Sequence, residues 1–245
     1  PASAVKLPRD SKKEMKTLDL DSVIRFLDTA KEQTEIAMER KGSGAYFYYT
    51  AYTLELNTGL RRGELLALKW QDIDFKKGTI KVCRQLVRVR GGFEFTETKT
   101  PLSNRVILPA KDVMRELERF KLIQTRERIK IGTIYNDNDL VFCTRDGKPI
   151  DPKNFVRNFK SVLKKAGLDE NLRFHDLRHT YAVLAASDGV DAKTIQENLG
   201  HHSPAFTMEV YGHSSNEMKR DASERICNLL KNHRLKGNSP SKGAI

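Results

Sequence analysis

One β-rich segment interrupts a chain whose apolar residues otherwise recur at helical spacing. Residues 79–108 contain the β-branched run TIKVCRQLVRV, a Gly-Gly pair at 91–92, the run FEFTET and the run RVILP. Such runs are typical of strands, and a Gly-Gly pair between them is typical of a hairpin turn. The segment therefore predicts a small three-stranded antiparallel sheet within a mainly helical α+β domain.

Helical patterns flank this segment on both sides. The predicted helices cover residues 19–40, 46–56, 64–70, 111–131, 153–166, 176–187, 191–199, 204–211 and 216–231. Asp19 or Asp21 can cap the first helix, and Gly167 can end the helix over 153–166. The apolar residues on the predicted buried side of the first helix are Val23, Ile24, Leu27, Ala30 and Ala37. Residues 139–143, DLVFC, resemble a short strand.

The two ends of the chain differ in composition from its middle. Residues 1–16 are basic with spaced prolines, and we interpret them as an interdomain linker. Residues 233–245 are basic and rich in Gly and Ser, which predicts a flexible tail. We expect residues 17–232 to form one folded domain. The sequence opens without Met, so we expect a fragment of a longer protein.

The charge balance narrows the class of partner. The 245 residues carry a formal net charge of +12, which favours nucleic acid as partner, then an anionic membrane, although many merely soluble proteins are basic. No apolar run approaches the roughly 18 residues that span a bilayer, so membrane binding is poorly supported. Three widely spaced cysteines favour reduced thiols in the cytoplasm.

Five short segments concentrate chemically useful side chains. They are TGLRRGELLALKW at 58–70, ETKTPLSNRVILP at 97–109, FHDLRHTY at 174–181, LGHHSP at 199–204 and TMEVYGH at 207–213. Each alone has an ordinary explanation: a surface arginine on a turn, a solvated lysine in a hairpin loop, a core tyrosine. FHDLRHTY is unusual because His175 and Arg178 are three residues apart and share one helical face, on which both can face one anion.

Taken together and in this order, the five segments resemble the catalytic domain of the tyrosine recombinases, the phage-integrase family. That family has an arginine in a TGxRxxE box, a lysine in a β-hairpin, an HxxR box, an LGH box and a nucleophilic tyrosine nine or ten residues later. Here Tyr211 follows His201 by ten residues. The resemblance covers about residues 19–230 and is greatest to integrases of conjugative transposons. It implies the tyrosine-recombinase catalytic fold for residues 17–232, without the N-terminal core-binding domain of relatives.

The resemblance implies three groups that bind the reacting phosphate. Arg61 and Arg178 would bind its non-bridging oxygens, where negative charge increases in the transition state. Guanidinium is suited to this task because it is planar, bidentate and permanently charged. His201 would donate a further hydrogen bond to the same phosphate.

The family also implies the groups that make and break bonds. Tyr211 would be the nucleophile that forms a 3′-phosphotyrosyl intermediate, which stores the energy of the broken phosphodiester. Lys99 would protonate the leaving 5′ oxygen, and His175 would accept a proton or a hydrogen bond near the tyrosine. The other tyrosines are expected to be core or supporting residues. Glu64 is expected to brace a neighbouring arginine or backbone amide.

A metal site is the competing interpretation of the histidines. His175 and His179 stand four residues apart, as in metalloprotease helices, and His201 with His202 could add ligands. The motif is HDLRH and not HExxH, however, and the arginine inside it would repel a cation. We therefore expect no metal and no cofactor.

The implied function is site-specific DNA recombination of the integrase and excisionase type on double-stranded DNA. Lys99 and Arg173 are expected to contact DNA phosphates. We expect a homotetramer on DNA, a monomer when free, a possible accessory directionality factor, and a bacterial cytoplasmic location. Two alternatives stay open: a type IB topoisomerase with the same chemistry, and a DNA-binding module without catalysis.

Overall fold

The structure is a computed structural model that describes residues 16–39, 46–97 and 104–200. Its helices are α1 (Leu20–Glu39), α2 (Tyr48–Thr58), α3 (Arg62–Leu66), α4 (Lys111–Ile131), α5 (Pro152–Lys165), α6 (His175–Ser187) and α7 (Ala192–Leu199), with 3₁₀ turns at Trp70–Asp72 and Gly132–Ile134. Its strands are β1 (Ile73–Asp74), β2 (Thr79–Val82), β3 (Arg84–Val89), β4 (Gly92–Glu97) and β5 (Arg105–Ile107). The predicted mainly helical α+β class is confirmed.

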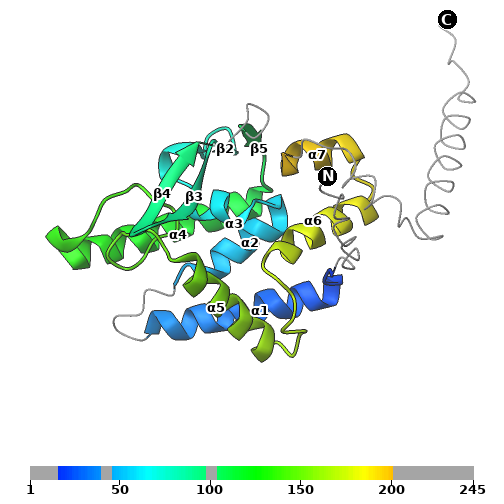
Figure 1. The fold of residues 1–245 in the computed structure, drawn as a ribbon, viewed down its shortest axis with the longest axis horizontal. Coiled ribbons are helices and arrows are strands. Elements are labelled where there is room, and N and C mark those ends of the chain that lie inside the picture. Colours follow the sequence, from blue (N-terminus) through cyan, green and yellow to red (C-terminus); the bar gives the residue numbers. More distant parts are fainter. Residues whose placement is uncertain (1–15, 40–45, 98–103, 201–245) are drawn as a thin grey trace, which may run out of the picture.

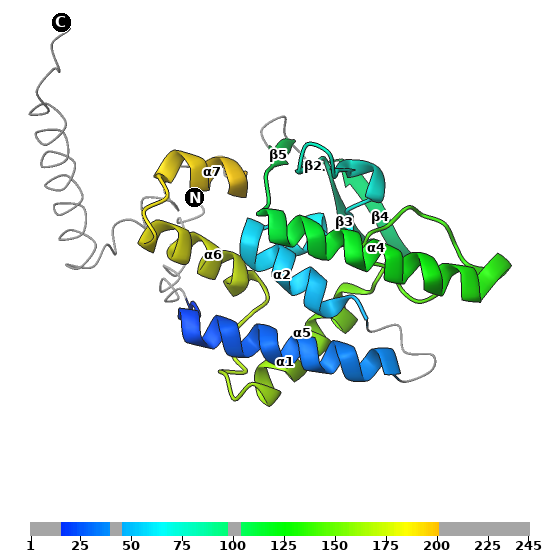
Figure 2. The ribbon, with the colours of Figure 1, turned by 180° about the vertical axis from the view of Figure 1, so that it is seen from behind.

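Helix α2 lies at the centre of the helical part, and it packs against α1, α4 and α6 (Figures 1 and 2). Its Tyr52 is fully buried, with its ring 5.1 Å from that of Phe26 on α1 and 5.5 Å from that of Phe155 on α5. Phe174, the residue before α6, joins the same aromatic cluster, with its ring 5.1 Å from that of Phe155. This cluster fixes where α6 begins.

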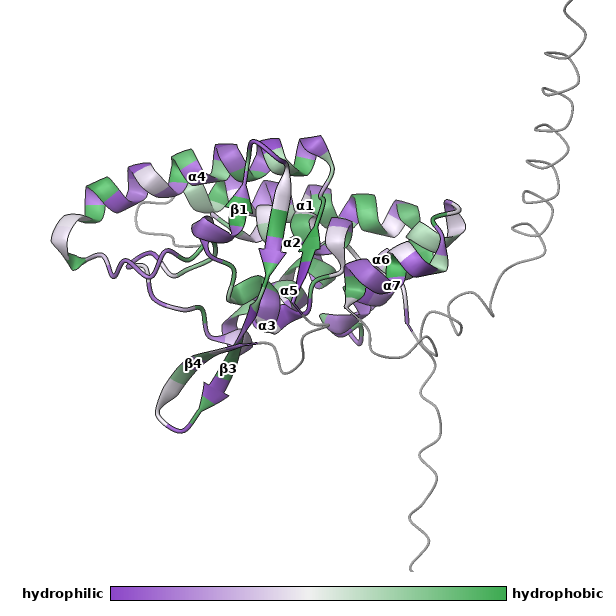
Figure 3. Ribbon diagram, turned by 90° about the horizontal axis from the view of Figure 1, so that it is seen from above, coloured by the Kyte–Doolittle hydropathy of each residue, from purple (hydrophilic) through white to green (hydrophobic). Residues whose placement is uncertain are grey.

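The predicted single sheet divides into two among the described residues. Strand β2 pairs antiparallel with β1 on one side and β5 on the other, whereas β3 pairs with β4 as a separate hairpin. The run TIKVCRQLVRV therefore changes partner at Cys83, between β2 and β3. Strand β1 was not predicted, because two residues are too few to show alternation. Figure 3 shows the β3–β4 hairpin extending away from the helices.

Most predicted helices are confirmed, and the differences have local causes. The helix over 111–131 has the predicted bounds, and Gly167 adopts the left-handed conformation that ends α5. The helix predicted over 64–70 ends at Leu66 instead, because the chain then extends to pair with residues 139–141. The expected strand over 139–143 is wrong: that segment makes only isolated bridges at Leu140 and Cys143.

The first helix is capped as predicted, but it is rotated slightly about its own axis relative to the predicted buried side. The Oδ1 of Asp19 accepts from the backbone N of Ser22 at 2.8 Å, as an N-cap does. Ile24 is 49% exposed although it was predicted to be buried, and Phe26 is buried in its place. The helices expected over 204–211 and 216–231 lie outside the described residues. No helix in the described part of the chain is long and apolar enough to cross a membrane.

Candidate active site

Four of the predicted site residues lie in the described part of the chain. Arg61 precedes α3, Arg173 precedes α6, and His175 and Arg178 lie on α6. Lys99, His201, His202 and Tyr211 fall outside the described residues. The geometry of the site therefore rests on the two arginines, on His175 and on the groups around them.

Arg178 is completely buried, which is rare for an arginine. Its Nη1 donates to the carbonyl of Gly59 at 2.5 Å and its Nη2 to the carbonyl of Leu199 at 2.6 Å. Burial, followed by repulsion from Arg61, lowers the pKa of Arg178 to about 9, so the group stays protonated at neutral pH. Its Nε is also buried and has no hydrogen-bond partner among the described residues.

Helix α2 ends sharply at Gly59, and this end presents the Gly59 carbonyl to Arg178. Gly59 takes the left-handed conformation, with φ of 62°, and its N–H donates to the carbonyl of Glu55. A Cβ here would lie 2.6 Å from both Leu199 Cδ2 and Tyr181 Cδ1. The position thus requires glycine for its backbone conformation and for the close approach of α6 and α7.

Arg61 lies at the start of α3, only two residues after this turn. Its backbone N and its Nη1 donate to the two carboxylate oxygens of Glu64, at 2.9 and 2.8 Å. Its Nη2 donates to the carbonyl of Gly200 at 3.1 Å. The predicted bracing role of Glu64 is seen in these two bonds, and the Arg61 side chain remains 35% exposed.

Arg105 is a third arginine at the site, and it lies outside the residues predicted from the motifs. Its Nη1 and Nη2 donate to the Oε1 and Oε2 of Glu64 at 3.1 and 2.8 Å, and its Nε donates to the carbonyl of Asn198 at 2.7 Å. Its side chain is only 7% exposed. The available signal was the alternation along β5: Arg105 shares a face with buried Ile107, whereas Val106 between them is 56% exposed.

The end of α7 brings the three arginines together. The consecutive carbonyls of Asn198, Leu199 and Gly200 accept from Arg105, Arg178 and Arg61, respectively. Carbonyls in the last turn of a helix have no intrahelical partner and carry the negative end of its dipole. The end of α7 is therefore a template that holds three guanidiniums from β5, α6 and the start of α3.

Two carboxyl groups lie among these cations and behave differently. Burial alone would raise the pKa of Glu64, but its hydrogen bonds and charge interactions with Arg105 and Arg61 outweigh that effect and lower it. Glu55 on α2 is fully buried, and neither of its carboxylate oxygens has a hydrogen-bond partner among the described residues. Burial raises the pKa of Glu55 well above its ordinary value, although Arg178 opposes the shift.

His175 begins α6 and faces the opening of the site. Its ring meets that of His179 edge-on, with centroids 4.7 Å apart. Desolvation against the helix, then the positive charge of His179 and of Arg178, lowers the pKa of His175 to about 4 although the residue is exposed. The imidazole is therefore neutral at pH 7. Asp176, in the first turn of α6, is buried, and its Oδ2 accepts from the backbone N of Arg173 at 2.7 Å.

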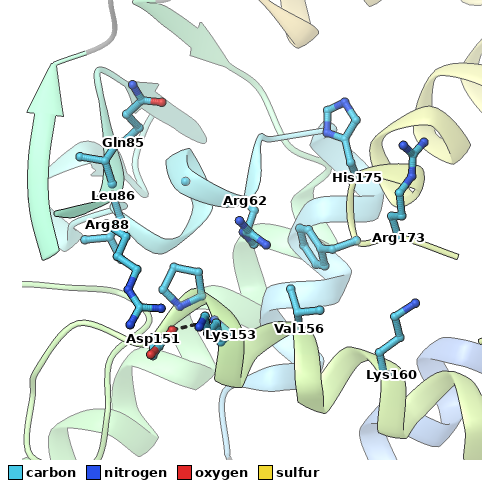
Figure 4. Close-up of a pocket in the computed structure, with 14 residues that line it drawn as sticks. Arg62, Gln85, Leu86, Arg88, Asp151, Lys153, Val156, Lys160, Arg173 and His175 are labelled. Atoms are coloured by element: carbon cyan, nitrogen blue, oxygen red, sulfur yellow. Dashed lines mark hydrogen bonds between the residues drawn. The ribbon is translucent and has the colours of Figure 1, made fainter. Parts of the chain in front are cut away.

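A basic cleft opens beside His175, between the β3–β4 hairpin, α3, α5 and the start of α6 (Figure 4). Its volume is about 860 Å³, and buried Leu86 and Phe174 are among its lining residues. The cations that line it are Arg62, Arg88, Lys153, Lys160 and Arg173. Its one acidic lining residue, Asp151, is occupied in capping α5. The cleft therefore suits a polyanion.

The cleft cations divide into two kinds. Arg173 is paired with Asp176, and Lys160 donates to the carbonyl of Leu172, so these two support the segment before α6. Arg62, Arg88 and Lys153 have no ion-pair partner within the described ranges, which leaves them available to an anion. The site can therefore bind one phosphate group, and the cleft beside it can bind further phosphates of the same polyanion.

A sequence profile of the phage integrase family matches residues 16–218. The chain is 35% identical over 191 residues to a "Tyrosine recombinase XerC-like" protein of Caldanaerobacter subterraneus, covering 73% of this chain and 49% of that protein. It is 34% identical over 183 residues to the ICEBs1 integrase of Bacillus subtilis, covering 75% of this chain and 49% of the integrase. The chain thus spans about half the length of these curated relatives.

Solved structures show the same similarity. The Tn1549 transposon integrase, in complex with circular intermediate DNA, superposes with a TM-score of 0.68 at 25% identity, covering 89% of this chain and 69% of that one. The XerA recombinase superposes with a TM-score of 0.61 at 25% identity, covering 86% and 64%. The predicted resemblance to tyrosine recombinases, and among them to transposon integrases, is confirmed.

Proposed function

The chain belongs to the phage integrase family, and from that membership we propose that it carries out the cleavage and rejoining steps of site-specific DNA recombination. The observation that carries the proposal is the convergence of Arg61 and Arg178 on the adjacent carbonyls of Gly200 and Leu199. These two guanidiniums come from segments more than a hundred residues apart in the sequence.

In the proposed reaction, the reacting phosphate binds between these two guanidiniums. The unpartnered Nε of Arg178 would donate to one oxygen, and Arg61 would donate from its partly exposed side chain. The five-coordinate transition state carries more negative charge on its non-bridging oxygens than the phosphodiester does. Fixed donors in a buried setting stabilise that extra charge without reorganisation, because the carbonyls and Glu64 already orient them. His201 would add a hydrogen bond to the same oxygens.

Bond formation and cleavage are assigned to three further groups. The hydroxyl oxygen of Tyr211 forms a bond to phosphorus while the bond from phosphorus to the 5′ oxygen breaks. The phenolic proton passes to His175, whose lowered pKa keeps it neutral at pH 7. Lys99 donates a proton to the departing 5′ oxygen. A 5′ hydroxyl from another strand reverses the sequence and restores free Tyr211.

The basic cleft would hold DNA next to the reacting phosphate. Arg62, Arg88 and Lys153 approach it from α3, the hairpin and α5, and Arg173 lines it beside His175 (Figure 4). Lys99 is proposed to contact phosphate as well. Binding through phosphates predicts an affinity that falls steeply as salt rises, since each neutralised phosphate releases counterions. Structural neighbours in complex with DNA, among them the Tn1549 transposon integrase, support this partner.

Assembly and organisation follow from the same proposal. We propose residues 17–232 as the catalytic domain, with residues 1–16 as linker and 233–245 as tail. A homotetramer would form on recombination sites from monomers that are separate in solution, and an accessory directionality factor would bias integration against excision. The proposed location is the bacterial cytoplasm, on the nucleoid.

Covalent trapping tests the function. The natural protein that carries this chain is incubated in EDTA with nicked duplexes drawn from the DNA on either side of its gene, beside a Tyr211→Phe variant. We expect an SDS-resistant protein–DNA adduct from the parent chain and none from the variant. An adduct that persists in Tyr211→Phe, or a parent chain that forms none on any flanking duplex, would refute the proposal. Relaxation of any supercoiled plasmid without site dependence would favour a topoisomerase instead.

A further inference from the structure

Arg105 has a place in the site that the proposed catalytic set does not explain. Its guanidinium is nearly buried, and each of its three nitrogens donates a hydrogen bond: two to Glu64 before the hairpin, one to Asn198 at the end of α7. One side chain on β5 thus joins α3 to α7. A guanidinium can do this because its donors form a rigid planar fork, which a lysine ammonium lacks.

We propose that Arg105 is a positioning residue for the DNA-cleavage step: by binding Glu64 and the end of α7 together, it fixes the guanidinium of Arg61 where the reacting phosphate binds. The inference rests on the proposed function and adds a residue to it. Arg105 acts through Glu64 and Gly200, and it need not touch DNA.

The first support is the way Glu64 is shared. Its Oε1 accepts from the Nη1 of Arg61 and the Nη1 of Arg105, and its Oε2 accepts from the backbone N of Arg61 and the Nη2 of Arg105. The Glu64 side chain is only 2% exposed, so water cannot replace a lost donor. Without Arg105, the buried carboxylate would draw Arg61 toward itself and away from the phosphate position.

The second support is the fit of Arg105 against the end of α7. Gly200 is left-handed, with φ of 63°, and a Cβ there would lie 2.9 Å from Nη1 of Arg105. The guanidinium therefore packs directly against the residue whose carbonyl holds Arg61. Asn198, which Arg105 binds through its carbonyl, also donates its side-chain amide to the hydroxyl of Tyr181 at 2.9 Å. Arg105 thus belongs to a connected set that fixes the end of α7 from two sides.

The test compares Arg105→Met and Arg105→Lys in the natural protein with a control, Arg115→Met. Arg115 is an exposed arginine on α4 that pairs only with neighbouring Asp112 in the described chain, so its loss should change nothing at the site. On the nicked flanking duplexes, Arg105→Met should slow single-turnover cleavage about 100-fold, the loss that misplacing a reacting group by about 1 Å can cause. DNA affinity should stay within about threefold, and Arg105→Lys should recover part of the rate.

The pH profile separates positioning from simple loss of stability. The charged groups that face Glu64 are Arg61 at the start of α3, Arg105 on β5, Arg178 on α6 and Glu55 on α2. Because Arg105 helps to lower the pKa of Glu64, Arg105→Met should move the acid side of the rate profile to higher pH. Adding Glu64→Gln to that variant should remove the movement. A ¹³C NMR titration of the Glu64 carboxyl should show the same shift without DNA.

The outcomes distinguish this inference from the proposed function. If the parent chain forms no adduct, the proposed function fails. If the parent chain and Arg105→Met cleave at the same rate, or if Arg105→Met slows cleavage only in step with its melting temperature and leaves the Glu64 titration unchanged, the positioning role is overturned while the function stands.

Discussion

Replacing Gly59 by alanine should damage both the fold and the site, because this residue connects α2 to α6 and α7. Its left-handed backbone, with φ of 62°, is strained for any residue with a Cβ. The added methyl would also meet Tyr181 and Leu199 at 2.6 Å, well inside van der Waals contact. Both neighbours are ring or branched side chains held by packing, so they cannot move aside freely.

The magnitude follows from two separate effects. Left-handed backbone costs alanine about 1–2 kcal/mol relative to glycine. Inserting a methyl into a packed interior costs about 1–3 kcal/mol more. Gly59→Ala should therefore lower the free energy of unfolding by about 2–5 kcal/mol, measured by urea denaturation. Any shift of the Gly59 carbonyl also weakens its hydrogen bond from Arg178. The rate of DNA cleavage per folded molecule should therefore fall as well.

Gly167→Ala is the matched control. Gly167 also ends a helix in the left-handed conformation, with φ of 65°, but a Cβ there would meet no atom within 4 Å. It should therefore lose only the backbone contribution, about 1–2 kcal/mol. Equal losses in the two variants would show that the close approach at Gly59 contributes nothing, and the packing argument would be refuted.

Two further variants and one titration test the charges of the site. Arg178→Lys should lower the free energy of unfolding by about 1–3 kcal/mol, because the carbonyl of Gly59 or Leu199 loses its donor, and should slow cleavage about 100-fold or more; unchanged cleavage would argue against the phosphate role. Burial raises the pKa of Glu55, so the fold favours its protonated form, and stability present below pH 4.5 is lost as pH rises. Glu55→Gln should therefore gain stability relative to the parent as pH rises above 4.5 in urea denaturation, and a constant difference would contradict this. The lowered pKa of His175 has the opposite sign: its contribution is complete above pH 6.5 and is lost as pH falls toward 4, so an imidazole ¹⁵N titration should show a midpoint below 6.5.

The helices were predictable because their signals are local. Caps such as Asp19, a C-terminal glycine such as Gly167 and apolar spacing all act within a few residues. The two sheets were not predictable to the same degree, because strand pairing depends on distant partners. The run from β2 into β3 is continuous in sequence, yet its two halves pair with different strands. The early end of α3 has the same origin, since residues 68–70 leave the helix to pair with residues 139–141.

The same dependence on distant partners limits prediction of the site. Arg61, His175 and Arg178 could be found because each lies in a short segment that resembles a motif of the phage integrase family. Arg105 could not be found in that way, because its importance comes from the elements it joins: a carboxylate 41 residues earlier and a carbonyl 93 residues later. Alternation along β5 places Arg105 inward, which only says that it must have buried partners. Arg105 points inward on a short strand, next to a segment proposed for catalysis. An arginine in such a place is a reason to look for a buried carboxylate that it shares with a second arginine.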